Sequence, residues 1–170
     1  WDAWDIDIWY EGQLVEHARP VASATFCNGP VRRGLLFDLA IGEGSRIRQR
    51  VTLPAGSRRL DFETQVDWRE CHRMLRVSFD TRINAAEATC DIQYGYLRRP
   101  THRNTSWDLA RFEVAAHRYA DISDLDEGMA LLNDCKYGYR LADGTLDLNL
   151  LRSPTDPDPD ADFGEHIFTY

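Results

Sequence analysis

The chain has 170 residues and a formal net charge of -8, with 43% hydrophobic and 11% aromatic side chains. These values fit a globular domain with a substantial core and exclude a disordered or fibrous protein. The acidic balance argues against general binding to polyanions, and no apolar run approaches the roughly 20 residues that span a bilayer.

Because the chain begins at Trp1 rather than at a methionine, we expect a processed product or a fragment of a longer protein. Alternation of apolar and polar side chains is the dominant pattern along it. Between Leu60 and Trp68 the two kinds alternate along the segment, which is typical of a half-buried strand. The same pattern predicts strands at 47–53, 60–68, 75–79, 92–96 and 112–116.

The clearest hairpin spans residues 137–150, "YGYRLADGTLDLNL". The dipeptide Asp143-Gly144 suits a type I′ turn, because glycine and aspartate tolerate the positive φ that this turn requires. Such a turn would place three apolar or aromatic pairs on one face: Leu141 with Leu146, Tyr139 with Leu148, and Tyr137 with Leu150.

Helical periodicity is weak throughout, and residues 122–132 could form at most one helical turn. Strands separated by turn residues at short spacing are typical of an antiparallel sandwich or barrel. The sequence therefore predicts an all-β protein, an antiparallel β-sandwich or a barrel, with few or no helices.

Residues 153–166, "SPTDPDPDADFGEH", are rich in proline and aspartate, which predicts a surface loop. Alternating aspartates from Asp156 to Asp162 resemble the ligand pattern of a calcium loop. However, Pro157 and Pro159 restrict the backbone and an alanine stands where an EF-hand needs glycine, so a solvated acidic loop is favoured. "HIFTY" after the loop begins another strand, and we expect more of the sheet beyond the end of the chain.

No motif in the chain nominates a metal site or a catalytic set. The histidines show no zinc-binding spacing, no pair of carboxylates stands out, and no nucleophile elbow or phosphate-binding glycine loop is present. The cysteines contain no C-x-x-C pair, and we expect reduced thiols in a cytoplasmic protein. They are Cys27, Cys71, Cys90 and Cys135.

Residues 97–108, "LRRPTHRNTSWD", gather three arginines, a histidine, an amide and a tryptophan in an acidic chain. Pro100 and the run that starts at Asn104 favour a loop between strands at 90–97 and 111–118. Guanidinium, amide and indole groups are suited to hold a sugar, but they equally suit a network that ties down a loop. The residues alone leave both interpretations open and favour the structural one. The candidates are Arg98, Arg99, His102, Asn104 and Trp107.

The segment "RPTHRNTSWDLARFEVAAHRYADIS", followed by "ALLNDCKYGY", "LLRSP" and "GEHIFTY", resembles the C-terminal part of family 38 α-mannosidases of the cytosolic type. "WDAWDIDIWY" resembles the segment that leads out of the catalytic half of those enzymes. The resemblance implies a lead-in segment at residues 1–20. It also implies a β-sandwich domain at 21–170, incomplete at its C-terminal end.

Members of this family are retaining exo-α-mannosidases whose nucleophile and divalent metal, usually zinc, lie in an N-terminal α/β domain. This chain lacks those motifs, so the resemblance implies that it is inactive alone and holds no cofactor itself. Its expected partners are the catalytic domain of the same enzyme, a mannose-containing oligosaccharide and further copies in a homo-oligomer, with no nucleic acid or membrane. The runner-up is a stand-alone carbohydrate-binding module, which needs its own sugar site.

The resemblance also assigns a role at the rim of the substrate pocket to Arg98 or Arg99, on a loop shaped by His102, Asn104 and Trp107. Adjacent residues of an extended segment point to opposite faces, so only one of the two arginines can point inward. We expect the other to lie in solvent or to pair with an acidic neighbour.

Overall fold

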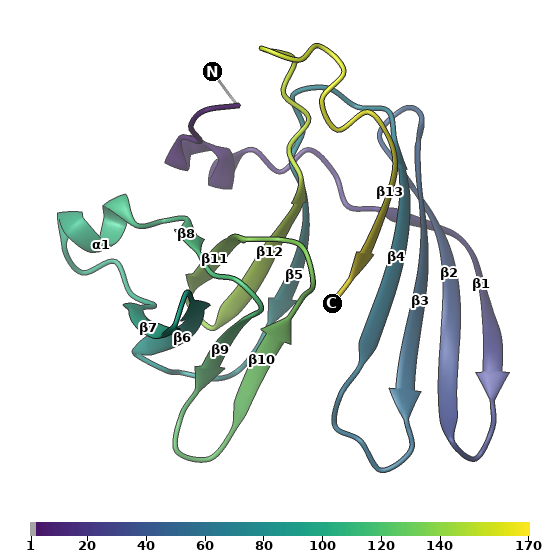
Figure 1. Cartoon of the computed structure of the whole chain (residues 1–170), viewed down its shortest axis with the longest axis horizontal. Helices are drawn as coiled ribbons and strands as arrows, with labels where there is room; N and C mark the ends of the chain where they lie inside the picture. Colours follow the sequence, from purple (N-terminus) through teal and green to yellow (C-terminus); the bar gives the residue numbers. More distant parts are fainter. Residues whose placement is uncertain (1–2) are drawn as a thin grey trace. The chain divides into compact units, whose positions relative to one another are not determined.

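The computed structural model describes residues 3–170, and 51% of the chain is strand and 6% helix. The all-β, antiparallel prediction is therefore confirmed (Figure 1). The elements in chain order are η1 (Ile8–Gly12), β1 (Arg19–Asn28), β2 (Arg32–Ile41), β3 (Ser45–Pro54), β4 (Asp61–Trp68), β5 (Leu75–Asp80), β6 (Glu87–Ile92), β7 (Gly95–Pro100), α1 (Ser106–Ala110), β8 (Val114–Ala115), β9 (Tyr119–Ser123), β10 (Gly128–Leu132), β11 (Gly138–Ala142), β12 (Thr145–Leu151) and β13 (Gly164–Thr169).

The chain folds as two compact units. Unit 1 consists of Trp1–Arg73 together with Arg152–Tyr170, and unit 2 consists of Met74–Leu151. The strands form three antiparallel sheets rather than the two of a simple sandwich. The assignment of residues 1–20 as a lead-in segment stays a prediction; β1 begins at Arg19.

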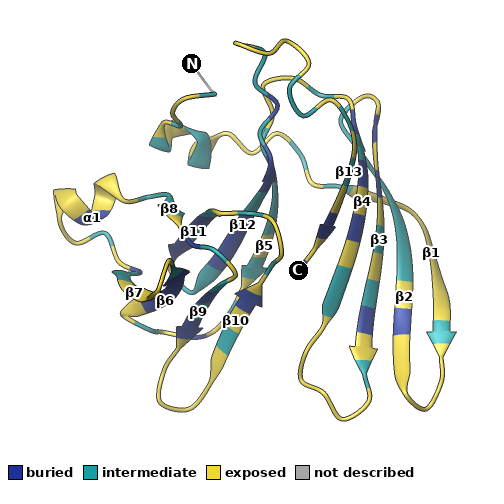
Figure 2. Cartoon of the chain, viewed as in Figure 1, coloured by how far each residue is buried: buried dark blue, intermediate teal, exposed yellow. Residues whose placement is uncertain are grey.

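Unit 1 contains a five-stranded sheet in the order β1-β2-β3-β4-β13. Its last strand comes from the far end of the chain and places Phe168 opposite Thr64 and His166 opposite Val66. Alternate side chains on β4 and β13 are buried, including Val66, Trp68 and Phe168, whereas β1 at the edge is almost entirely exposed (Figure 2). The strands predicted at 47–53, at 60–68 and in "HIFTY" are therefore confirmed as β3, β4 and β13.

Unit 2 contains two four-stranded sheets, in the orders β10-β9-β6-β7 and β5-β12-β11-β8. The largest side chains in its core are Tyr139, Leu146 and Leu148, all fully buried. The hydroxyl of Tyr139, on β11, donates to the carbonyl oxygen of His117, just before β9, at 3.4 Å. The two sheets thus share a core, and burial raises the pKa of the Tyr139 hydroxyl.

The β11–β12 hairpin has the predicted register. Asp143 and Gly144 have φ values of 53° and 75°, the positive values that a type I′ turn requires. The ladder contains two of the three predicted pairs, Tyr139 with Leu148 and Leu141 with Leu146. Tyr137 lies before β11 and is 59% exposed, so its predicted pairing with Leu150 is not part of the ladder.

The strand predicted at 92–96 is wrong. β6 ends at Ile92 and β7 begins at Gly95, with Gln93 and Tyr94 forming the turn between them. Tyr94 adopts a φ of 66°, which no local sequence signal announces, because bulky residues rarely take this conformation. The apparent alternation thus spans the two sides of a tight hairpin.

Two further segments differ from their predictions. The strand expected at 112–116 is reduced to two residues, Val114–Ala115, so 97–108 is not flanked by two long strands. Residues 122–132 contribute to a β9–β10 hairpin instead of a helical turn, and the Asp124 carboxylate accepts backbone hydrogen bonds from its turn. The two helices within residues 3–170, η1 and α1, have five residues each, too few to cross a bilayer.

Candidate functional site

The two candidate arginines lie on β7 and point to opposite faces, as predicted. The Arg98 side chain is 65% exposed and lies 3.6 Å from the Glu87 carboxylate on β6. Arg99 turns inward, donates to the carbonyl oxygen of Ala115 at 3.0 Å, and acts electrostatically on the buried thiol of Cys90. Burial raises the pKa of the Cys90 thiol, and the Arg99 guanidinium partly opposes that rise. The inward arginine is thus held by the core of unit 2.

The loop after β7 is organised around one aspartate. Asp108 is buried, and it forms a capping box with Thr105: Thr105 N–H donates to the Asp108 carboxylate, and Asp108 N–H donates to the Thr105 hydroxyl. Arg111 adds an ion pair at 2.8 Å. Hydrogen bonding from the Thr105 hydroxyl and from Arg111 lowers the pKa of the Asp108 carboxyl. The loop therefore carries the one-turn helix α1, which the sequence prediction missed.

The other candidates of this loop lie around that aspartate. His102 Nδ1 is 3.6 Å from the Asp108 carboxylate and accepts a long hydrogen bond from the backbone N–H of Asn104. Trp107 projects from α1 and is 75% exposed. The predicted residues of the loop thus lie near one another, and the polar ring of His102 contributes to holding the loop itself.

The acidic segment forms a loop between β12 and β13, as predicted. Its Asp162 carboxylate accepts the backbone N–H groups of Arg152 and Ser153 at 2.9 Å each. No group of three or more His, Cys, Asp or Glu side chains within residues 3–170 is placed to hold a metal ion. The described residues therefore do not offer a zinc or calcium site. All four cysteines are free.

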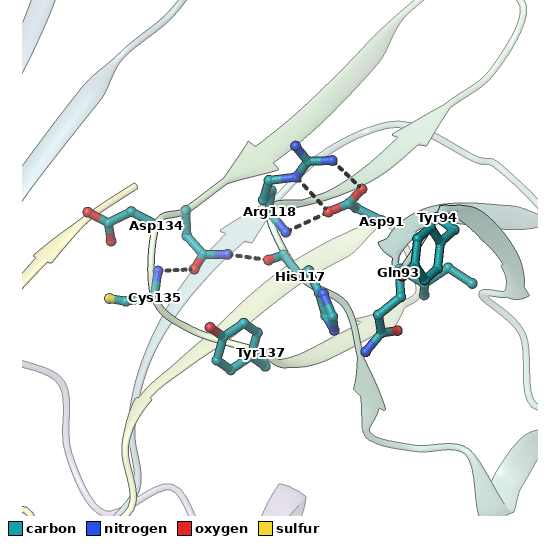
Figure 3. Close-up of a pocket in the computed structure, with 10 residues that line it drawn as sticks. Asp91, Gln93, Tyr94, His117, Arg118, Asp134, Cys135 and Tyr137 are labelled. Atoms are coloured by element: carbon teal, nitrogen blue, oxygen red, sulfur yellow. Dashed lines mark hydrogen bonds and ion pairs between the residues drawn. The ribbon is translucent and has the colours of Figure 1, made fainter.

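A pocket of about 280 Å³ lies in unit 2, where three segments converge. They are the end of β6 with its following turn, the residues just before β9, and the loop between β10 and β11 (Figure 3). The residues that line it are Asp91, Ile92, Gln93, Tyr94, His117, Arg118, Asn133, Asp134, Cys135 and Tyr137.

Asp91 fixes the first two segments to each other. Its carboxylate is buried and accepts hydrogen bonds from the Arg118 guanidinium at 3.1 and 3.2 Å and from the Arg118 backbone N–H at 3.0 Å. Its backbone carbonyl accepts the N–H of His117 at 2.9 Å. The hydrogen bonds from the Arg118 side chain are the main cause of a lowered pKa of the Asp91 carboxyl, which stays ionised.

Asn133 fixes the third segment. Its amide donates to the carbonyl oxygen of His117 at 3.0 Å, and its own backbone N–H donates to the carbonyl oxygen of Arg118 at 2.9 Å. Its side-chain oxygen accepts the backbone N–H of Cys135 at 3.0 Å and that of Lys136 at 2.5 Å. Its amide also contacts the Tyr139 hydroxyl. One amide thus links both neighbouring segments and the core.

The hydrogen bonds of Asp91 and Asn133 form a frame that joins the three segments. Most other polar groups that line the pocket make no hydrogen bond within the described residues. Within residues 3–170 the Gln93 amide and the hydroxyls of Tyr94 and Tyr137 make no hydrogen bond. The His117 imidazole packs edge-on against the Tyr137 ring, with 5.4 Å between ring centroids. In Figure 3 the Tyr94 and Tyr137 rings lie on opposite sides of His117. Sequence reasoning assigned none of these residues a role.

Comparison with known proteins assigns the chain to a protein family. Residues 1–160 match the model of the glycosyl hydrolases family 38 C-terminal domain. The chain is 46% identical over 175 residues to alpha-mannosidase 2C1 of Homo sapiens and 49% identical over 179 residues to alpha-mannosidase G of Dictyostelium discoideum. Each match covers 100% of this chain and 16% of the relative, so the chain spans about a sixth of the relatives' length.

A solved structure shares the fold. The crystal structure of an alpha-mannosidase from Enterococcus faecalis V583 superposes with a TM-score of 0.79 and 20% identity, covering 91% of this chain and 22% of that one. At this identity the likeness concerns the fold alone. The family match over nearly the whole chain identifies this protein as a member of the glycosyl hydrolases family 38 C-terminal domain family.

Proposed function

We propose that the chain is the non-catalytic C-terminal part of a family 38 α-mannosidase that releases terminal α-mannosides from oligosaccharides with retention of configuration. The observation that carries this proposal is the 46% identity to alpha-mannosidase 2C1 over the full length of the chain. The nucleophile and the zinc or other divalent metal belong to parts of the enzyme outside this chain. Alone, the chain is inactive.

The domain's role in the enzyme is to complete the substrate cleft and to supply contacts to the catalytic domain and to other subunits in a cytoplasmic enzyme. Exposed apolar side chains support such contacts, because large apolar groups in solvent often mark interaction surfaces. Those of unit 1 with more than 60% exposure include Trp4, Trp9, Leu14, Val15, Val21, Val31 and Ile167.

Of the two candidate arginines, Arg98 is the one available to the cleft. Its ion pair to Glu87 is long and exposed, so it contributes little stability and is easily exchanged for another partner. Arg99 is committed to Ala115 and Cys90 inside unit 2. Arg98 therefore reaches a substrate hydroxyl or a carboxylate of the cleft, while His102 and the Thr105–Asp108 capping box hold the loop that follows.

The test is to make Arg98→Ala and Arg99→Ala separately in the full-length enzyme and to measure both kcat/KM on α-mannosides and thermal stability. Loss of a charged hydrogen bond to bound substrate costs roughly 1.5–3 kcal/mol, or about ten- to a hundredfold in kcat/KM. We expect that loss for Arg98→Ala at unchanged Tm, and mainly a lowered Tm for Arg99→Ala. Unchanged activity in Arg98→Ala would leave the β7 loop with a structural role only.

A chelator should abolish the activity of the full-length enzyme, because the metal is proposed to act in catalysis. The circular dichroism of the isolated chain should not change with the chelator, since its described residues offer no metal site. Mannosidase activity in the isolated chain would contradict the assignment as a non-catalytic part.

A further inference from the structure

We propose that the pocket formed by the β6–β7 turn, the residues before β9 and the β10–β11 loop binds one neutral pyranose residue of a saccharide. The Tyr94 and Tyr137 rings supply the apolar faces, and the Gln93 amide and the two tyrosine hydroxyls supply hydrogen-bonding groups. This inference deepens the proposed function, on which it rests for the choice of a mannoside as the sugar.

The first argument is the contrast between a rigid frame and free functional groups. Asp91 and Asn133 have their hydrogen-bonding capacity committed to joining the three segments. The groups carried by that frame, the Gln93 amide and the two tyrosine hydroxyls, have no partner within residues 3–170. Because the backbone segments that carry these groups are fixed before binding, less conformational entropy is lost when a ligand binds.

The second argument is the conformation of Tyr94. Its backbone is in the left-handed region, with a φ of 66°, where a glycine would be more stable than a tyrosine. Its side chain is completely exposed, with a relative exposure of 109%, so it adds nothing to the packing of the domain. A strained position occupied by an aromatic ring that packs against nothing in the domain is explained by contact with a ligand.

The third argument concerns the charge of the ligand. Two nitrogens of the Arg118 guanidinium donate to the Asp91 carboxylate, so this pair brings no net positive charge to the pocket that would attract an anion. Within the described residues, no group of three or more His, Cys, Asp or Glu side chains could hold a metal ion. Aromatic faces with neutral hydrogen-bonding groups fit a polyhydroxylated, uncharged ring, whose C–H faces stack and whose hydroxyls both donate and accept. A volume of about 280 Å³ is at the small end for ligand pockets, which suits a single ring.

The experiment uses the full-length enzyme that contains this chain, with its catalytic cleft blocked by a covalent mannosidase inhibitor, and a thio-linked α-mannobioside as the calorimetric probe, so that only binding outside the cleft is measured. Tyr94→Gly and Tyr137→Ala should each weaken binding about three- to tenfold, as expected for the loss of one aromatic contact. Tyr94→Gly should leave Tm unchanged or raise it, because glycine relieves the backbone strain. Tyr96→Ala, which removes an exposed tyrosine of β7 outside the pocket, is the matched control and should bind as the wild type does.

The possible outcomes distinguish a failure of the pocket proposal from a failure of the proposed function. The pocket proposal is contradicted if both pocket variants bind the probe as the wild type does, or if the wild type does not bind it at millimolar concentration. This holds even if the enzyme hydrolyses mannosides. A lowered Tm in Tyr94→Gly also overturns it, because the ring would then pack against another part of the enzyme. An enzyme without activity on mannosides, whose binding still depends on Tyr94 and Tyr137, contradicts the proposed function and supports the pocket.

Discussion

Two regions of unit 2, the loop at residues 101–111 and the pocket, use similar side chains in opposite ways. In the loop, Asp108 and Thr105 bond to each other's backbone, and Arg111 turns back onto Asp108. In the pocket, Asp91 and Asn133 bond to neighbouring segments, and that frame leaves the Gln93 amide free.

The difference shows that the density of polar residues in a sequence is a poor guide to binding. Residues 97–108 are the most conspicuous polar cluster in the chain, but their closeness in sequence lets them satisfy one another. The pocket takes its residues from three separate segments, at 91–94, 117–118 and 133–137, so the groups that face it are not all neighbours along the chain.

The comparison of loop and pocket can be tested by mutation, and we expect the largest loss of stability from Asn133→Ala. The change removes the amide that donates to the part-buried carbonyl of His117 and the oxygen that accepts two backbone N–H groups, at a cost of about 2–3 kcal/mol. For a chain of this size that lowers Tm by about 5–10 °C. The matched control is Asn104→Ala, an exposed amide of the loop, which should change stability by less than about 0.5 kcal/mol. Equal decreases in Tm for Asn133→Ala and Asn104→Ala would contradict the proposed difference between the pocket and the loop.

An acid titration should reveal the Asp91–Arg118 pair. The pKa of Asp91 is lower in the folded protein than the value of about 3.9 in an unfolded chain, mainly because of hydrogen bonds from Arg118. The folded state thus binds fewer protons, and the pair stabilises it above that unfolded value. This stabilisation is lost as the pH falls through the lower folded pKa. Between pH 5 and 2.5 the Tm of the wild type should fall more steeply than that of Asp91→Asn; parallel profiles would show that the pair contributes no such stabilisation.

A smaller effect is expected from Thr105→Ala, which removes the hydroxyl of the capping box. Loss of an N-cap costs about 1 kcal/mol, and here the cost falls on the single turn of α1. Hydrogen exchange of the amides of Asp108 and Leu109 should become faster, while exchange in the pocket loop stays the same. Ser106→Ala, an adjacent exposed hydroxyl, should change neither. Faster exchange throughout unit 2 would mean that loop and pocket form one cooperative structure.

The smallest effect is expected from Glu87→Ala, which removes the ion-pair partner of Arg98. Both side chains are more than half exposed, and such pairs contribute about 0–1 kcal/mol. A Tm within about 2 °C of the wild type is expected from thermal unfolding. A substantially larger decrease would show that Arg98 depends on Glu87 for more than a loose contact.

The fold could be predicted from the sequence where side-chain alternation and turn chemistry agree. β3 and β4 alternate over eight or more residues, and Asp143-Gly144 supplies the positive φ values that set the β11–β12 register. The prediction failed at 92–96 because Tyr94 takes a conformation that tyrosine usually avoids. The helix α1 was missed although its signal, threonine followed by aspartate three positions later, is present at Thr105.

For the site, the sequence predicted the opposed directions of Arg98 and Arg99, because that follows from strand geometry alone. It could not place His117 beside Tyr137, because their 5.4 Å contact depends on the pairing of β9, β10 and β11 with their neighbours. Long-range pairing of that kind is not encoded in the spacing of residues within any one segment.

The pairing of β13 with β4 has a consequence for how the protein is made. Unit 2 is one continuous stretch, Met74–Leu151, whereas the sheet of unit 1 stays incomplete until Gly164–Thr169 has left the ribosome. While unit 2 is being synthesised, the backbone of β4 presents an unpaired edge, which is a template for wrong pairing with other nascent chains. A premature stop between Trp68 and Gly164 would leave that edge open permanently, so such truncated translation products should be cleared by proteases or aggregate.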